Sequence, residues 1–295
     1  MQVHELVAAS FPGGPQKPPQ WHGPFRGELP ESIPHVDVIA AEGRRRYVAL
    51  RANALLWLCH RDEAIEFHSW TPTPHDAVRL RFARILLETD SAAEIPALTP
   101  AATILREILG EAGVGAIPLV SGATGIATWI PFADAPEYPP VRAWLHEVCN
   151  EAVRRAPRIV TNEPNSHAGG RVHLHVGSNA PGRYSALPYS LRGTPSLDVC
   201  TPIRWEELAT VKPGVTTAAN FEARWNAVGE IFGPQAEVLH AQRFARARTA
   251  TRTRNSARSA IASCSNVRPA MRTSTTPTPS RRASTAAPIT RNSAC

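Results

Sequence analysis

Lysine is almost absent from this chain of 295 residues, since only Lys17 and Lys212 occur. A groove that follows a nucleic-acid backbone would therefore depend mainly on arginine for its phosphate contacts. Acidic residues are absent in turn from 240–295, where eleven of the 32 basic residues lie. The remaining 21 bases face 25 acids, so residues 1–239 carry a net charge of about −4, and the basic pI reflects only the C-terminal segment.

Cysteine is scattered, and long apolar runs are missing. The five cysteines are odd in number, scattered and without a C-x-x-C pair, so neither a zinc knuckle nor a disulfide framework is indicated and a reducing compartment is favoured. No run approaches the roughly 18 apolar residues of a membrane-spanning helix, and the first residues lack the basic start and apolar core of a signal peptide. These absences predict a cytoplasmic protein without a membrane partner.

The apolar pattern predicts an α+β domain with a mixed or antiparallel sheet and flanking helices. Asn53 is expected to cap the first helix, and Thr99, followed by Pro100, is expected to cap the second, which Gly113 ends. Strands are predicted at 46–50, 64–68, 78–87, 117–120, 126–130, 171–176, 184–187 and 199–203, and helices at 54–60 and from 99, 139 and 205.

Composition divides the chain into three segments. Residues 1–45, rich in Pro and Gly, are predicted to be a poorly ordered, partial N-terminal lead-in, and 46–234 to form the folded domain. Residues 240–295 consist largely of Arg, Ser, Thr, Ala and Pro without an apolar period, so we expect a disordered tail. An arginine-rich tail of this kind favours non-specific binding to nucleic acid.

A predicted hairpin at the centre of the chain has a turn that suits a phosphate. Ser121-Gly122-Ala123-Thr124-Gly125 joins two apolar, β-branched runs. Its glycines allow a close backbone approach, and free N–H groups with two hydroxyls match phosphate oxygens. A turn with glycines is also an ordinary hairpin connection, so the loop alone leaves both interpretations open.

Several separated motifs resemble those of the polymerase domain of bacterial ATP-dependent DNA ligase D, a branch of the archaeo-eukaryotic primase superfamily. Their order and spacing are more specific than any single one. The resemblance covers roughly residues 12–234 and is that of a truncated member, because the family's N-terminal region is largely missing. The matching stretches are Gln16-Lys17, 54–58 (ALLWL), 65–70 (IEFHSW), Ser121-Gly122 with Gly125-Ile126, Asn179, 189–192 (YSLR) and 201–208 (TPIRWEEL).

The resemblance implies template-guided nucleotidyl transfer at DNA breaks during non-homologous end joining in the bacterial cytoplasm, at the nucleoid. Its implied partners are DNA ends, NTP or dNTP, the Ku protein and an ATP-dependent DNA ligase. Family members hold two Mg²⁺ or Mn²⁺ ions on three aspartates, two of them in a D-x-D whose period of two places both on one strand face. The metals activate the primer 3′-hydroxyl and neutralise triphosphate charge.

This sequence departs from the family pattern at the metal positions. Leu86 and Glu88 stand at the D-x-D, His175 stands at the third aspartate, and Ala127 replaces a histidine after the phosphate loop. One carboxylate and one imidazole do not reproduce a three-carboxylate magnesium site. The resemblance therefore predicts a degenerate member with weak or lost catalysis, whose remaining catalytic and metal-binding candidates are Glu88 and His175.

Other positions keep residue types that suit a nucleotide. A plainer interpretation remains open for two of them, with His68 capping a turn at a strand end and Arg192 pairing with an acid such as Asp198. The resemblance assigns nucleotide binding to His68, Ser121, Thr124, Arg192 and, less closely matched, Lys17.

Two rearrangements would restore a metal site. His173 and His175 share one strand face and would bind zinc or manganese together with Glu88. A slipped register would instead use Asp90 of Glu88-Thr89-Asp90, and Asp76 or Asp134 are further substitutes. Either change would support an active manganese-dependent enzyme. The alternative is a non-catalytic remnant with a basic tail that binds nucleotide or nucleic acid.

Overall fold

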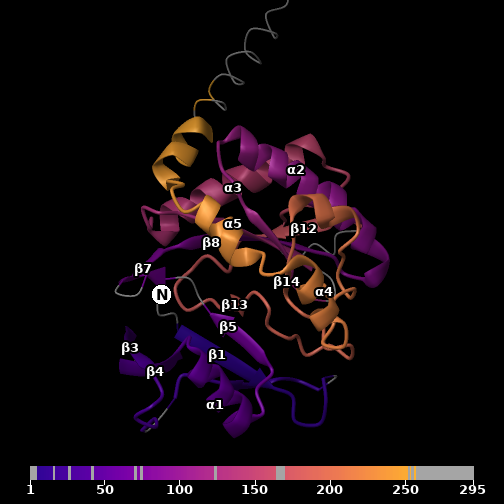
Figure 1. Ribbon diagram of the computed structural model, residues 1–295. Helices are drawn as coiled ribbons and strands as arrows, with labels where there is room; N and C mark the ends of the chain where they lie inside the picture. The colour runs from indigo at the N-terminus through magenta and orange to yellow at the C-terminus, as the bar shows by residue number, and fades with distance from the viewer. Residues whose placement is uncertain are drawn as a thin grey trace, which may run out of the picture. The chain divides into compact units, whose positions relative to one another are not determined.

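The computed structural model describes residues 5–15, 17–25, 28–40, 43–69, 72–73, 76–122, 125–163, 170–251, 253 and 256. Contacts divide the chain into two units, Met1–Arg254 and Asn255–Cys295, and every element named below lies in the first. Sheets and helices are mixed in that unit, which confirms the predicted α+β class (Figure 1). Gln16, Trp70 and Thr124, which the sequence motifs include, lie outside the described residues.

The first sheet is antiparallel and is built largely from N-terminal residues, in the order β13-β5-β1-β4-β3 with β2 beside β1. Leu6 and Ala8 of β1 are fully buried in a core that includes Leu58 of α1. The prediction of a poorly ordered lead-in is therefore wrong for these residues. The elements are β1 (Glu5–Ser10), β2 (Gln20–His22), β3 (His35–Ala40), β4 (Gly43–Ala49), α1 (Ala52–Asp62), β5 (Glu66–Ser69) and β13 (Ser185–Ala186).

The second sheet has the order β11-β12-β8-β10-β9-β14, and only the β11–β12 pair is parallel. The predicted hairpin is confirmed, because β9 and β10 pair with Ile126 opposite Val120. Its strands are β8 (Phe82–Glu88), β9 (Ile117–Val120), β10 (Gly125–Pro131), β11 (Val160–Thr161), β12 (Val172–His175) and β14 (Thr201–Pro202).

Strand β8 decides which residues face the core and which face the site. Ala83, Ile85 and Leu87 are fully buried in the core that α2 (Leu98–Glu111) and α3 (Tyr138–Arg155) complete. Figure 1 shows these two helices lying together over this sheet. Because side chains alternate along a strand, Arg84, Leu86 and Glu88 face the opposite side.

Several predicted boundaries and caps differ from the structure. The single strand expected at 78–87 is two strands, β7 (Asp76–Leu80), which pairs with β6 (Pro72–Thr73), and β8. Neither expected cap residue performs that role, although α2 does end just before Gly113. The Thr99 hydroxyl donates to the Leu208 carbonyl (3.0 Å), and the Asn53 amide donates to the Ser32 carbonyl (2.8 Å).

The folded chain extends beyond the predicted end of the domain. Phe244 and Ala247, on a helical stretch that spans 244–251, are buried beside α3. The Trp144 indole donates to the Thr251 hydroxyl (3.0 Å), and Asp134 accepts the Phe244 N–H (3.0 Å). Disorder from residue 240 onward is therefore wrong for this stretch. It follows η2 (Trp205–Ala209), α4 (Phe221–Val228) and α5 (Phe232–Val238).

No helix among the described residues has the length and apolar character needed to cross a bilayer.

Candidate functional site

One cavity of about 430 Å³ gathers most of the predicted site residues. It lies between the two sheets, with β5 and β13 on one side and β8, β10 and β12 on the other. Lys17 does not line it, and Thr124 lies outside the described residues. The predicted positions that do line it are His68, Leu86, Glu88, Ser121, Ala127, His175 and Arg192.

The three positions aligned with the metal-binding aspartates are neighbours on adjacent strands. His175 of β12 pairs directly with Leu86 of β8, and His173 pairs with Glu88. Glu88 is exposed at the end of β8, and the His175 ring lies against Gly177, where an added Cβ would meet it at 2.7 Å. The alignment from sequence therefore selected positions that the fold brings together.

The slipped register and the substitute acids are not supported by the structure. Glu88 pairs with Gly125 at the last position of β8, and Asp90 lies beyond the strand, where its N–H donates to Glu94 (3.0 Å). Asp90 does not line the cavity. Asp134 is committed to the helical stretch that begins at Phe244. The side chain of Asp76 lies outside the described residues.

The donors present do not fit two hard divalent cations. In the part of the chain that the structure describes, no group of three or more His, Cys, Asp and Glu side chains is placed to hold a metal ion. His173 and His175 have ring centroids 6.1 Å apart, but His173 does not line the cavity. Magnesium and manganese prefer several carboxylate oxygens, and Glu88 is the one carboxylate among the described lining residues.

Glu66, to which the sequence interpretation gave no role, holds two of the predicted nucleotide-binding residues. Glu66 is 4% exposed, its carboxylate accepts hydrogen bonds from His68 Nε2 (2.6 Å) and the Gly193 N–H (2.9 Å), and it forms an ion pair with Arg192 Nε (3.3 Å). His68 lies within β5 rather than at a turn, and the Arg192 side chain pairs with Glu66 rather than with Asp198. The interpretation of His68 as a turn cap is therefore wrong, whereas Arg192 does pair with an acid, which is Glu66 in place of Asp198.

Burial and pairing set the charge states of this group. Burial would raise the pKa of Glu66, but the hydrogen bond from His68 and the charge of Arg192 hold that pKa below its usual 4.5. Burial lowers the pKa of His68, and the opposing effect of Glu66 is smaller. The imidazole is consequently neutral near pH 7, and its Nε2–H donates to a carboxylate, which can only accept.

The phosphate loop is closed on itself and braced by Arg192. The sequence interpretation assumed free N–H groups in this loop. The Ser121 N–H instead donates to the Gly125 carbonyl (3.0 Å), so this N–H is not free for a phosphate. Arg192 Nη1 donates to the Ser121 carbonyl (3.2 Å). Gly122 has φ +128°, and an added Cβ would lie 3.2 Å from Arg192, so glycine is required for this close approach.

Arg84 is a cavity residue that the sequence interpretation missed. It lies two residues before Leu86 on β8 and is 1% exposed. Its guanidinium lies 4.8 Å from the ring centroid of Trp129, its partner on β10, and donates weakly to the Ser69 carbonyl (3.4 Å). Burial lowers its pKa to about 10, which still leaves it charged at pH 7. The period-two spacing of Arg84, Leu86 and Glu88 was the one available sign.

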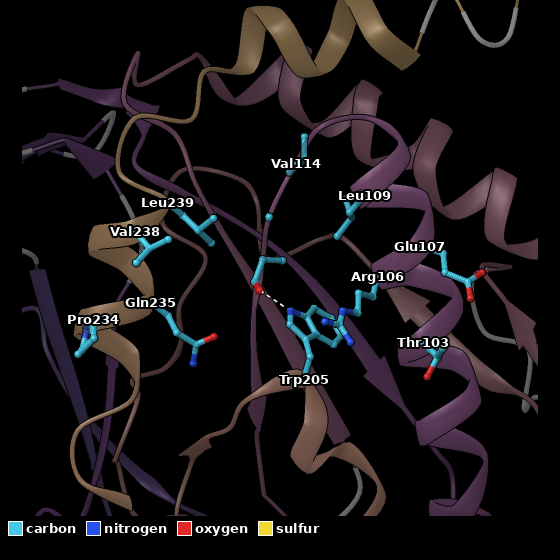
Figure 2. Close-up of a pocket in the computed structure, with 13 residues that line it drawn as sticks. Thr103, Arg106, Glu107, Leu109, Val114, Trp205, Pro234, Gln235, Val238 and Leu239 are labelled. Atoms are coloured by element: carbon cyan, nitrogen blue, oxygen red, sulfur yellow. Dashed lines mark hydrogen bonds between the residues drawn. The ribbon is translucent and has the colours of Figure 1, made fainter.

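A larger cavity, of about 780 Å³, lies elsewhere between α2, α5 and η2 and contains none of the predicted site residues (Figure 2). Figure 2 shows Arg106 beside the Trp205 ring, whose Nε1–H donates to the Ala116 carbonyl (2.8 Å). Arg106 is already paired with Glu206 (3.2 Å). With a mostly apolar wall and a paired cation, this cavity lacks the converging polar groups of the first.

Comparison with known proteins agrees with this geometry. The sequence model of the protein family described as the LigD primase-polymerase domain matches residues 4–232. Identity is 26% over 202 residues with the bifunctional non-homologous end joining protein LigD of Bacillus subtilis, covering 65% of this chain and 32% of that protein. It is 23% over 211 residues with the multifunctional non-homologous end joining DNA repair protein LigD of Mycobacterium tuberculosis, covering 67% and 27%.

The fold is that of a polymerase domain. The polymerase domain from Mycobacterium tuberculosis ligase D in complex with DNA superposes with a TM-score of 0.70 at 19% identity, covering 81% of this chain and 85% of that one. The chain belongs to the LigD primase-polymerase domain family, so the resemblance found from the sequence motifs is confirmed. It spans about a third of the length of the curated relatives that it matches.

Proposed function

We propose that this chain serves bacterial non-homologous end joining as a primase-polymerase domain that binds a nucleotide and DNA ends but has largely or wholly lost nucleotidyl transfer. The observation that carries this proposal is the convergence of Ser121, Arg192 and His68 on a cavity whose metal positions hold Leu86 and His175. The phosphate-contacting residue types remain, while the carboxylates that would hold two cations do not.

A further cavity, which adjoins the one that holds the predicted site residues, supports a nucleotide as the ligand. About 380 Å³ in volume, it shares Trp129 with the first and is lined mainly by apolar and aromatic side chains, among them Phe67, Phe82 and Phe232. Such walls suit a nucleobase, whereas the first cavity suits anionic groups. The proposed partners are DNA ends, NTP or dNTP, Ku and an ATP-dependent DNA ligase, at the nucleoid in the cytoplasm.

Primer extension with ribonucleotides and Mn²⁺ tests the proposed loss of catalysis. We expect no template-dependent extension by the wild-type protein, and the same result for Glu88→Ala, because one carboxylate does not hold the two ions that the reaction needs. Extended primers should be scored on a sequencing gel with Mg²⁺ and with Mn²⁺. Template-dependent extension that Glu88→Ala abolishes would contradict the proposal and establish Glu88 as a catalytic residue.

A further inference from the structure

Buried hydrogen-bond donors without partners gather on the cavity between the sheets. Among the described residues, three buried side-chain atoms of residues that line this cavity lack a hydrogen-bond partner. They are Arg84 Nε, Trp129 Nε1 and Ser178 Oγ. Buried polar groups are normally paired, and arginine and indole nitrogens can only donate. The cavity therefore offers unused donors to a ligand that carries acceptor atoms.

Among the residues that the structure describes, no carboxylate pairs with Arg84 to compensate its charge. Of its nearest groups, the Trp129 ring and the Ser69 carbonyl carry no full negative charge. The Glu66 carboxylate is occupied by His68 and Arg192. Glu88 is four residues further along β8, a distance of about 13 Å at the rise of a strand. A buried cation without a partner is costly, so an anion that enters the cavity would stabilise it.

Arg84 lies in the same cavity as the positions aligned with the family's metal-binding aspartates, which are Leu86, Glu88 and His175. It precedes Leu86 by two residues on the same face of β8. Arg192 provides a second guanidinium in the same cavity. The arginine fork matches phosphate oxygens in geometry and stays charged at any physiological pH.

We propose that the cavity is a metal-independent site for a polyphosphate chain, in which the Arg84 guanidinium supplies the countercharge that divalent cations supply elsewhere in the family. This deepens the proposed function, on which it rests, by making the phosphates of the bound nucleotide the ligand of Arg84. Magnesium bound to the polyphosphate would compete with the guanidinium for the same oxygens. Divalent metal should therefore weaken binding rather than support it.

The test uses inorganic tripolyphosphate as the probe and the full chain as the protein. Titration calorimetry in EDTA should show binding by the wild type, and excess Mg²⁺ should reduce the affinity. Arg84→Met should lose at least tenfold in affinity in EDTA. Arg106→Met is the matched control, because Arg106 also lies over a tryptophan (5.4 Å from the Trp205 ring centroid) but in the other cavity, and it should bind as the wild type does.

A thermal readout guards against misfolding of the variant. Removal of an unpaired buried charge should raise the Tm of Arg84→Met in the absence of ligand, while tripolyphosphate should raise the Tm of the wild type alone. If Arg84→Met fails to fold, the comparison of EDTA with Mg²⁺ in the wild type decides by itself. Absence of binding in EDTA, or equal binding by Arg84→Met and the wild type, would overturn the proposal.

A parallel titration with ATP separates this proposal from the proposed function. ATP binding that requires Mg²⁺ or Mn²⁺ would refute metal independence and leave nucleotide binding intact. Failure of both ATP and tripolyphosphate to bind under every condition would refute both.

Discussion

Replacing Glu66 with alanine is expected to lower the free energy of unfolding by about 3 to 5 kcal/mol, the cost of breaking a buried ion pair by removing one partner. Glu66 is 4% exposed, accepts hydrogen bonds from His68 and the Gly193 N–H and pairs with Arg192, so its loss leaves two donors without their acceptor and one cation without its partner. The Tm should fall by roughly 10 °C. Denaturant unfolding and calorimetry both measure this change.

The control for this variant is Glu137→Ala, which removes a carboxylate from an exposed pair with Arg79. An exposed pair contributes about 1 kcal/mol or less, so this control should unfold nearly as the wild type does. A loss of less than about 1 kcal/mol for Glu66→Ala would show that Glu66 does not anchor the site.

The same pair predicts a pH dependence. The pKa of Glu66 is lower in the folded state than its ordinary 4.5, so its stabilisation is present above pH 4.5 and is lost as the pH falls through the folded pKa. His68 also has a lowered pKa, so the folded state resists its protonation and loses stability as the pH falls below 6.5. The part of the stability difference between wild type and Glu66→Ala that comes from the charged carboxylate should therefore shrink as the pH falls below 4.5.

Restoring the missing aspartates is expected to create a metal site. Leu86→Asp with His175→Asp would place two carboxylates on directly paired positions, with Glu88 on the same face of β8. Mn²⁺ affinity, measured by electron paramagnetic resonance, should rise by roughly a hundredfold, since loss of even a supporting group beside a metal ligand costs about 10- to 100-fold. Adding Arg84→Met should raise it further by removing a buried positive charge.

The control for the aspartate variant makes the same charge change elsewhere. Leu56→Asp with His240→Asp alters one leucine on α1 and one histidine in the turn after α5, both at exposed positions, and it should not bind Mn²⁺ more tightly than the wild type. If the wild type already binds Mn²⁺ as tightly as the restored variant does, the conclusion that its donors do not fit the metal is wrong.

The motifs in the sequence were enough to select residues that line the cavity, but they did not reveal the buried charged groups Glu66 and Arg84. The spacing from the matched family motifs selected Leu86, Glu88 and His175, and the paired strands bring these positions together. Glu66 was recognised as part of a motif without a role, because the Gly193 that it binds is 127 residues away. A buried arginine in a strand has no pattern that separates it from an exposed one, which is why Arg84 was missed.

The prediction of disorder was wrong for β1 and for the helical stretch 244–251, and the two errors have a related cause. β1 is a short stretch, buried on both faces and followed by a segment rich in Pro and Gly, so it shows no alternation. Phe244 and Ala247 are isolated apolar residues among arginines, and their burial depends on Phe132 and Trp144 of distant elements. Composition over a window does not detect such contacts, because they form only in the folded chain.

Crystals grown with both tripolyphosphate and Mn²⁺, with diffraction measured at the manganese absorption edge, test the replacement of metal by guanidinium most directly. We predict phosphate oxygens within hydrogen-bonding distance of Arg84 and Arg192, and no anomalous peak in the cavity between the sheets. A manganese peak that bridges the polyphosphate to Glu88 or His175 would contradict this prediction.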